Sequence, residues 1–328
     1  SRFLPAGFYY KMFIHPRPFW KYIYEPFIRQ SAGLGKAPSL KDTSDYEHFY
    51  AFYDLVIIGG GVSGLNAALT AAESGLKILI MEQNSEWGGR CIVDFPFINE
   101  EPGLKYISRI LSELRKYKNV TMRSRMMGAG VYDHGYLLGY ERLNDHLSTN
   151  EGPRHRLWRI RAKQIITATG AIERPLSFPG NDIPGIMLAS AVRDYATNFG
   201  VAVGDKVAIF TNNDDAYRTA ITLHEIGVTV PVIIDARLGG GGELAHHAKE
   251  LGIRVANGKA ILEVFGQKRV KAVTICDYEK SGANKEKIEC DSIAMSGGWS
   301  PVVHLFSHCG GKLKWDEDLA LFRPDKAA

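Results

Sequence analysis

One stretch, Asp54–Gly64, limits the folds open to this chain more than any other feature. It begins with Leu55–Ile58, a short apolar run rich in β-branched residues, which is typical of a strand buried on both faces of a sheet. Gly59, Gly61 and Gly64 follow with the spacing G-x-G-x-x-G, and the Ala- and Leu-rich segment after them predicts a helix. The stretch therefore predicts a strand, a tight turn and a helix in direct succession.

In such a unit the three glycines have separate mechanical roles. Gly59 permits the tight turn, Gly61 lets a pyrophosphate approach the backbone, and Gly64 lets the helix pack closely against the strand. The helix N-terminus adds free N–H groups and a partial positive charge for the phosphates. We interpret the unit as the nucleotide-binding turn of a Rossmann-type domain, and we call such a phosphate-binding turn a nucleotide or phosphate grip. The alternative is a Rossmann-like turn that binds nothing.

A carboxylate follows at the position that such a grip requires. A second buried strand, Lys77–Met81, leads into Glu82, which lies 18 residues beyond Gly64. An acid there accepts hydrogen bonds from the hydroxyls of the adenosine ribose, and it would repel a 2′-phosphate. The sequence therefore favours NAD or FAD over NADP.

Two further segments are expected near the same ligand. Trp87–Arg90, with the sequence WGGR, predicts a loop beside the nucleotide in which Arg90 is a candidate phosphate partner. The alternative for this segment is a surface turn with an exposed arginine. A later predicted strand ends in Ala168, Thr169 and Gly170, whose small size allows the backbone to approach a ligand at the carboxyl edge of a sheet.

The length of 328 residues suggests two or three domains. The segment Ile293–Pro301 repeats the strand and small residues of 166–170, which indicates a return to the first domain near the end of the chain. The predicted parts are an aromatic arm with a polar linker (1–52), a first dinucleotide-binding domain (53–175 and 291–328) and an inserted, degenerate Rossmann-like domain (176–290).

The inserted domain is predicted to lack a nucleotide grip of its own. The turn after its first strand, Thr211–Ala216, contains no glycine, and Asp214 and Asp215 stand where a pyrophosphate would meet the helix. Their charges would repel the phosphates, and their side chains can cap the helix instead. We therefore expect a Rossmann-like domain without the usual phosphate contacts.

The first 34 residues are rich in aromatic side chains, with charged residues among them. The interleaved charges exclude a membrane helix, and no RNA-binding sheet motif accompanies the aromatic residues. Two interpretations remain for this arm. It packs against the rest of the chain, or it forms a subunit interface, where Tyr, Trp, Phe and Arg are favoured.

Composition excludes several other classes of protein. The net charge of +4 comes without a block of Lys or Arg of the kind that binds nucleic acid. The four cysteines are widely spaced and form no C-x-x-C pair, so we expect reduced thiols in a cytoplasmic protein and no metal site. No apolar run approaches the roughly 20 residues that span a bilayer, and no signal peptide is visible.

Five segments together carry a resemblance to a known family. They are RFLPAGFYYK, AGLG, the glycine-rich turn, WGGR and SGGWSP, at residues 2–11, 32–35, 59–64, 87–90 and 296–301. The chain resembles the two-dinucleotide-domain flavoproteins of the glutathione reductase and thioredoxin reductase class. More narrowly, it is similar to the alpha subunit of heterotetrameric sarcosine oxidase, and we expect a fragment or a shortened relative of that subunit.

The resemblance implies part of an oxidoreductase complex that oxidatively demethylates sarcosine to glycine. The alpha subunit would hold NAD in the first domain, where relatives hold FAD. A beta-type subunit would carry FAD and the amine-oxidising site, with an FMN at the subunit interface and further small subunits in the complex. Family members oxidise several secondary amines, and another subunit would make that choice. The residues that carry over to the nucleotide are Gly59, Gly61, Ser63, Gly64, Glu82, Gln83 and Arg90.

Two other functions remain open. The same site holding FAD would make the chain a self-contained FAD-dependent oxidoreductase of an amine or amino acid, and an empty site would make it a non-catalytic assembly scaffold. A reductase that passes electrons from NADPH through flavin to a disulfide is not expected, because it needs two nucleotide grips and a cysteine pair. The sequence predicts no catalytic triad and no other catalytic residue.

Overall fold

The structure is a computed structural model that describes residues 15–36, 39–148, 152–280 and 282–325. It divides into two compact units, Ser1–Asp45 and Tyr46–Ala328. In the first unit the described helical elements are α2 (Arg17–Phe19), a π-helical turn (Trp20–Tyr24) and α3 (Glu25–Ser31). Together they form a helical segment from Arg17 to Ser31. The aromatic residues of the arm before residue 15, and the segment RFLPAGFYYK, lie outside the described residues.

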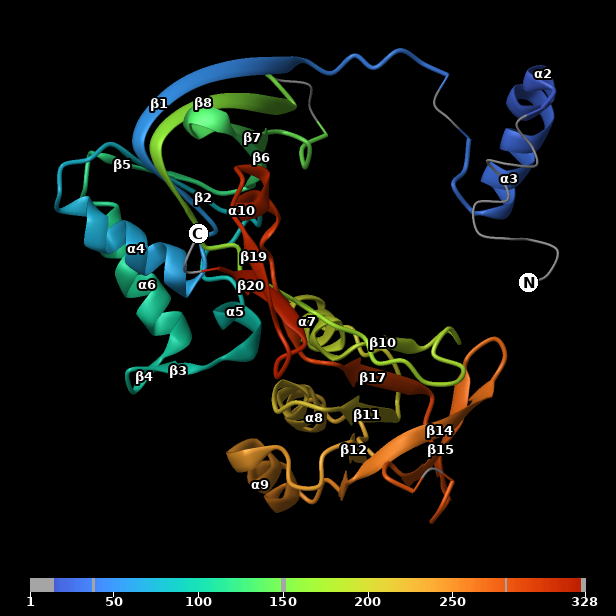
Figure 1. Ribbon diagram of the computed structural model, residues 1–328. Coiled ribbons are helices and arrows are strands. Elements are labelled where there is room, and N and C mark those ends of the chain that lie inside the picture. The colour runs from blue at the N-terminus through green and yellow to red at the C-terminus, as the bar shows by residue number, and fades with distance from the viewer. Residues whose placement is uncertain (1–14, 37–38, 149–151, 281, 326–328) are drawn as a thin grey trace. The chain divides into compact units, whose positions relative to one another are not determined.

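The second unit contains a six-stranded sheet with the order β5-β2-β1-β8-β7-β6 (Figure 1). Strands β5, β2, β1 and β8 are parallel, whereas β8, β7 and β6 form an antiparallel meander. This sheet and its helices are called the first domain. Its elements are β1 (Tyr46–Ile58), α4 (Val62–Ala72), β2 (Ile78–Met81), α6 (Gly103–Leu114), β5 (Val120–Arg123), β6 (Met126–Tyr132), β7 (Tyr136–Arg142) and β8 (His155–Thr167).

The end of β1 is buried on both faces, as its continuous apolar run predicted. Leu55 and Ile57 pack against α4 and α6, whereas Val56 and Ile58 face the meander. Alternate residues of a strand point to opposite faces, so one short run contributes side chains to the hydrophobic cores on both faces of the sheet. Helix α6 buries an apolar stripe that includes Ile107, and its polar face is exposed.

β1 is longer than the sequence suggested. It begins at Tyr46 rather than at Leu55, so the polar linker predicted to reach residue 52 is shorter. β1 pairs in parallel with β8 along nearly its whole length, and β8 is one continuous strand. Many side chains in the first half of β1 are exposed, which obscures the alternation that marks a strand in sequence.

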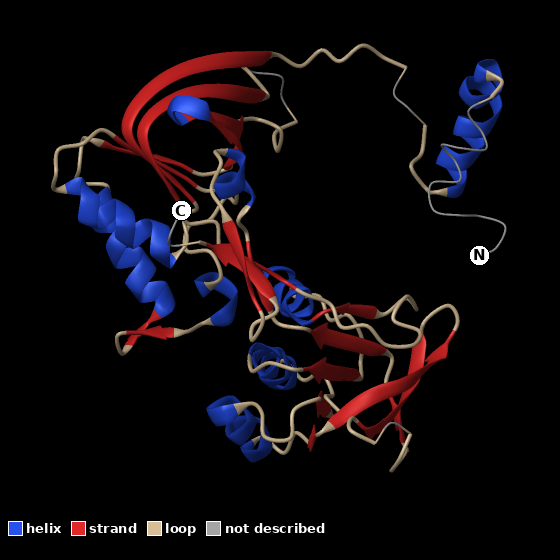
Figure 2. Cartoon of the chain, in the orientation of Figure 1, coloured by secondary structure: helices blue, strands red, loops and turns tan. Residues whose placement is uncertain are grey.

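A second sheet, with the order β10-β17-β11-β12-β13, is parallel throughout. Three helices cover one face, and an antiparallel sheet, β14-β15-β16, covers the other (Figure 2). This arrangement confirms the predicted second Rossmann-like domain, called the second domain. Its elements are β10 (Ile186–Leu188), α7 (Ala189–Phe199), β11 (Val207–Thr211), α8 (Asp215–Glu225), β12 (Ile233–Asp235), α9 (Gly242–Glu250), β13 (Val255–Asn257), β14 (Lys259–Gly266), β15 (Val270–Asp277), β16 (Glu286–Glu289) and β17 (Ser292–Ser296).

The strand predicted to return to the first domain belongs instead to the second sheet. β17 lies between β10 and β11, with Ile293 beside Ala208 of β11. The chain returns after Gly297, where β18 (Trp299–Pro301) pairs with β9 (Ala171–Glu173) and α10 (His304–His308) packs on β6. A buried strand followed by small residues occurs in both sheets, so the pattern alone could not assign the strand to one of them.

Short elements complete the described fold. They are α5 (Cys91–Asp94), β3 (Phe97–Ile98), β4 (Glu101–Pro102), a 3₁₀ turn (Asp133–Gly135), β19 (Leu313–Asp316) and β20 (Leu321–Pro324). The 3₁₀ turn connects β6 and β7. In the part of the chain that the structure describes, no helix combines the length and apolar character that crossing a membrane requires.

Candidate functional site

The turn between β1 and α4 contains two glycines that packing requires. Gly59 has φ +112°, and a Cβ there would lie 2.2 Å from the carbonyl oxygen of Ala168. A Cβ on Gly64 would lie 1.9 Å from the carbonyl oxygen of Gly59. Backbone atoms of the protein itself therefore exclude a side chain at both positions. This agrees with the tight turn and the close helix–strand packing predicted for them.

Gly61 differs from the other two glycines, because no contact among the described residues requires a glycine there. Its φ of −74° suits any residue, and a Cβ there would meet only the Cα of Gly89, at 3.9 Å. Gly61 is the N-cap of α4 and makes no side-chain cap hydrogen bond, and Ser63 is exposed in the first helical turn. An open space in front of an uncapped helix N-terminus suits an anionic group.

Glu82 lies next to this space, at the end of β2, and is 5% exposed. Its Oε2 accepts a hydrogen bond from the Gly60 N–H at 2.8 Å, and its Oε1 accepts one from the Asn84 N–H at 2.8 Å. A carboxylate has about four lone-pair positions, so each oxygen can still accept from a ligand hydroxyl. The neighbouring Gln83 is exposed, and its carbonyl oxygen accepts from Arg142 at 3.0 Å.

The WGGR loop closes against the glycine turn, and its place beside a nucleotide stays a prediction. The Gly88 N–H donates to the carbonyl oxygen of Gly60 at 2.9 Å, and Gly88 forms an isolated parallel bridge with Gly61. A Cβ on Gly89 would lie 3.1 Å from the Cα of Gly61. The loop therefore forms one wall of the open space, and we call this space, bounded by Gly61, Glu82 and Gly89, the cradle.

Arg90 follows this wall directly, and its partners are carboxylates. Its Nε and Nη2 donate to Asp94 at 3.2 and 2.7 Å, and its Nη1 lies 2.8 and 2.9 Å from the two oxygens of Asp194. The guanidinium carbon lies 5.6 Å from the ring centroid of Trp299. Burial lowers the pKa of Arg90 and the two carboxylates raise it, with a net increase. Its role as a phosphate partner stays a prediction.

Thr169 and Gly170 lie at the carboxyl end of β8 and connect it to the C-terminal part of the chain. The Thr169 hydroxyl donates to the carbonyl oxygen of Val302 at 2.6 Å, and the Val302 N–H donates to that of Gly170 at 2.9 Å. Gly170 has φ +70°, and a Cβ there would meet no atom within 4 Å. The structure thus places both residues at the sheet edge, as predicted.

The corresponding turn of the second domain is closed by acidic side chains. Neither carboxylate caps α8, contrary to the prediction, because Asn213 accepts from the Asp215 N–H at 3.1 Å instead. Asp214 accepts from the Gly241 N–H at 2.8 Å and pairs with Arg237 at 2.7 Å. These acids lie at the turn between β11 and α8, and the absence of a phosphate grip in this domain stays a prediction.

Sequence reasoning missed the partner of Asp215, which is Arg193 of α7. The Arg193 side chain has no exposure and lies 3.0 Å from Asp215 and 2.8 Å from Asp94. Nothing in the sequence separates this arginine from an exposed helical one, because its partners come from α5 and α8, which are distant along the chain.

Cysteine and metal chemistry find little support in the described residues. All four cysteines are unpaired, and three of them are buried. Burial raises the pKa of Cys290 to about 12 and also raises the pKa of Cys91, which disfavours their thiolates. Within the described ranges, no three His, Cys, Asp or Glu side chains gather in a way that could hold a metal ion.

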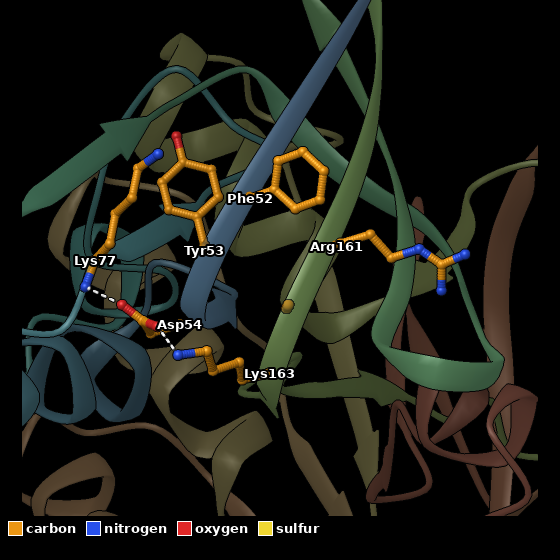
Figure 3. Close-up of a pocket in the computed structure, with 7 residues that line it drawn as sticks. Phe52, Tyr53, Asp54, Lys77, Arg161 and Lys163 are labelled. Atoms are coloured by element: carbon orange, nitrogen blue, oxygen red, sulfur yellow. Dashed lines mark hydrogen bonds and ion pairs between the residues drawn. The ribbon is translucent and has the colours of Figure 1, made fainter.

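A cavity of about 390 Å³ opens far from the cradle, at the other end of the core segments of β1 and β2 (Figure 3). Asp54 lies in it, 2.7 Å from the ammonium of Lys163, and accepts from the Lys77 N–H at 2.9 Å. The Lys163 hydrogen bond lowers the pKa of Asp54. Open α/β sheets bind ligands at the carboxyl ends of their strands, and this cavity lies at the amino ends. The lining residues are Phe52, Tyr53, Asp54, Lys77, Arg161, Ala162 and Lys163.

Comparison with known proteins agrees with this geometry. A family model described as pyridine nucleotide-disulphide oxidoreductase matches residues 53–321. Sarcosine oxidase subunit alpha of Rhizobium meliloti (strain 1021) is 39% identical over 324 residues, which are 98% of this chain and 32% of the relative. The subunit alpha of Corynebacterium sp. (strain U-96) is 34% identical over 90% of this chain and 31% of the relative. The chain thus spans about a third of the length of these curated relatives, and the resemblance drawn from sequence is confirmed.

Solved structures with low sequence identity share the fold. L-proline dehydrogenase from P. horikoshii superposes with a TM-score of 0.63 and 21% identity, over 88% of this chain and 50% of that chain. Thioredoxin reductase of T. acidophilum gives a TM-score of 0.60 and 19% identity, over 80% and 82%. The predicted fold class, two Rossmann-type domains in the arrangement of thioredoxin reductase, is therefore confirmed. This is a fold that binds flavins and nucleotides.

Proposed function

The chain belongs to the pyridine nucleotide-disulphide oxidoreductase family, a family of oxidoreductases, and we propose that it is the nucleotide-holding portion of an amine-oxidising flavoenzyme complex. The single observation that carries the proposal is the cradle, an open space at the N-terminus of α4 that no contact in the described part of the chain explains. The nucleotide is NAD, and the complex resembles sarcosine oxidase in oxidatively demethylating sarcosine to glycine. The similarity of this chain to two sarcosine oxidase alpha subunits, over most of its length, supports a complex of that type.

The residues around the cradle fit an adenine dinucleotide. The pyrophosphate is held by the backbone at Gly59 and Gly61 and by the first turn of α4, including Ser63. Glu82 accepts the ribose hydroxyls, with Gln83 beside it. Thr169 and Gly170 lie at the same sheet edge. A bound NAD here is largely structural, whereas a bound flavin could carry out the oxidation of a C–N bond.

The complex has further members in this proposal. A beta-type flavin subunit carries the amine-oxidising site, further small subunits complete the assembly, and an FMN lies at a subunit interface. The location is cytoplasmic, which suits four unpaired cysteines. The described cysteines provide no redox pair, and the second domain has an acidic turn, so the chain does not act as a disulfide reductase.

A second candidate function is a self-contained FAD-dependent oxidoreductase of an amine or amino acid. It is favoured by the fold, which the chain shares with L-proline dehydrogenase and thioredoxin reductase, and by a cradle that suits the adenosine diphosphate half of FAD as well as of NAD. A scaffold with an empty site is the third possibility.

The experiment that tests the proposal identifies the bound ligand. Purified protein is denatured, and the released small molecules are analysed by absorbance and mass spectrometry. Release of NAD without flavin supports the proposal, whereas release of FAD, with absorbance near 450 nm before denaturation, supports the second candidate. A protein that releases nothing, and then binds neither NAD nor FAD in calorimetry, would contradict both and favour the scaffold.

Replacing Glu82 with alanine is expected to weaken dinucleotide binding by about 1–3 kcal/mol, because the ribose hydroxyls lose a charged acceptor. Isothermal titration calorimetry measures the change. Glu86→Ala, an exposed acid in the same loop, is the matched control and should leave the affinity unchanged. Unchanged affinity in the Glu82 variant would mean that the adenosine lies elsewhere.

Replacing Gly61 with valine is expected to abolish dinucleotide binding and to leave the fold intact. The new side chain would fill the cradle, where the protein itself presents only Gly89 at 3.9 Å. The poor N-cap costs about 1 kcal/mol of stability. Circular dichroism and calorimetry together check both statements, and a variant that still binds at the wild-type affinity would show that the pyrophosphate does not approach this turn.

A further inference from the structure

A chain of ion pairs connects the second domain to the wall of the cradle. It begins at Asp215, the first residue of α8, which lies 3.0 Å from Nη2 of Arg193. The same Nη2 lies 2.8 Å from Asp94 of α5, in the first domain. Asp94 holds Arg90 through two hydrogen bonds, and Asp194 of α7 binds Arg90 from the other side. Helices α5 and α7 lie next to each other at this junction (Figure 1).

Arg193 is unusual among the residues of this chain of ion pairs, because it is completely buried. Its Nη1 donates to the carbonyl oxygen of Asp215 at 3.1 Å and to the Thr219 hydroxyl at 3.0 Å, whereas its buried Nε has no hydrogen-bond partner among the described residues. A buried arginine is tolerated only where carboxylates balance its charge. Asp94 and Asp215 meet this need from two different domains, so the arginine holds α5 and α8 together.

Arg90 sits at the point where this chain of ion pairs meets the cradle. The residue before it, Gly89, approaches the Cα of Gly61, and Gly88 makes one hydrogen bond to Gly60. This bond, the Gly61–Gly88 bridge and the Trp87 ring at Gly60 form one attachment of the loop to the glycine turn. The four contacts of Arg90 with Asp94 and Asp194 add a second attachment, and one of these two carboxylates belongs to the second domain.

We propose that the second domain, which has no phosphate grip, positions the nucleotide loop of the first domain through Arg193 and Asp194. Arg193 holds Asp94, Asp94 and Asp194 hold Arg90, and Arg90 holds the wall of the cradle. Asp215, one of the two acids in the turn between β11 and α8, anchors the whole chain of ion pairs. These residues are positioning residues. The inference rests on the proposed function only for the identity of the ligand in the cradle.

The test uses Asp194→Asn, because this side chain is 36% exposed and its loss is compatible with folding. Two quantities are measured on the purified full chain. One is the amide hydrogen exchange of the peptide covering residues 84–95, without ligand. The other is the affinity for NAD and, separately, for FAD by calorimetry. Glu289→Gln, an 82% exposed acid on β16 of the same domain, is the matched control.

The expected result is faster exchange in the loop, by about threefold, and an affinity about tenfold weaker for the dinucleotide that the wild type binds. Arg90→Met should give the same two changes. The double variant Arg90→Met with Asp194→Asn should be no worse than Arg90→Met alone, because Asp194 acts through Arg90. The control should match the wild type in both measurements.

Each other outcome has a distinct meaning. Wild-type exchange in the loop of Asp194→Asn would overturn the inference. A large loss of affinity in Arg90→Met, with none in Asp194→Asn, would also overturn it and leave Arg90 as a direct phosphate ligand. If the wild type binds neither dinucleotide but exchange still rises in Asp194→Asn, the proposed function fails and the positioning of the loop stands.

Discussion

Replacing Gly64 with alanine is expected to unfold the first domain. The new Cβ would lie 1.9 Å from the carbonyl oxygen of Gly59 and 3.0 Å from its carbon. Both are backbone atoms at the end of β1, so relief requires α4 to move away from the sheet. That movement would withdraw Leu65, Ala68 and Ala72 from the core. We expect a loss of more than about 4 kcal/mol, which is a large part of the 5–15 kcal/mol that stabilises a typical domain.

The matched control is the same substitution three residues earlier. Gly61→Ala adds a Cβ that meets only the Cα of Gly89, at 3.9 Å, so its free energy of unfolding should stay within about 1 kcal/mol of the wild type. Urea unfolding followed by circular dichroism compares the two variants. Equal midpoints for Gly64→Ala and the wild type would show that α4 does not pack as closely on β1 as the structure has it.

Replacing Arg193 with leucine is expected to destabilise the protein by about 3–5 kcal/mol. The change removes a fully buried cation and leaves Asp94 and Asp215 to face each other without their shared partner. Removing one member of a buried ion pair leaves an uncompensated charge, which costs far more than the pair itself contributes. Chemical denaturation measures the loss. Arg90 still pairs with Asp94 in this variant, so we expect most of the loss of stability to come from the charge of Asp215.

A neighbouring arginine provides the control for this prediction. Arg218 of α8 also approaches Asp215, at 3.7 Å, but its side chain is 38% exposed. Exposed ion pairs contribute little, so Arg218→Leu should change stability by no more than about 1 kcal/mol. Similar losses in the two variants would mean that burial of Arg193 does not govern its contribution.

The features that sequence could predict are local. The strand, turn and helix at 54–72 follow from the G-x-G-x-x-G spacing and from apolar patterns within a few residues. The structure explains Gly59 and Gly64 by contacts made inside that unit. Glu82 follows the next predicted strand, and parallel strands end at the same edge of a sheet, so its nearness to the turn was also predictable.

The features that sequence missed depend on partners far along the chain. β1 extends back to Tyr46 only because β8, more than a hundred residues later, pairs with it. β17 joins the second sheet rather than the first, and its own apolar run fits either. The burial of Arg193 likewise requires α5 and α8 to meet around it.

Spacing within a short segment sets backbone geometry and local charge, so the strand, turn and helix of the first domain and the acidic turn of the second could be predicted from sequence. Only the tertiary structure decided what that acidic turn does. Asp215 anchors a buried arginine whose chain of ion pairs reaches the loop at Arg90. Ion pairs between residues far apart in the sequence produce no recognisable sequence pattern, because ion pairing depends on distance and burial in the folded chain.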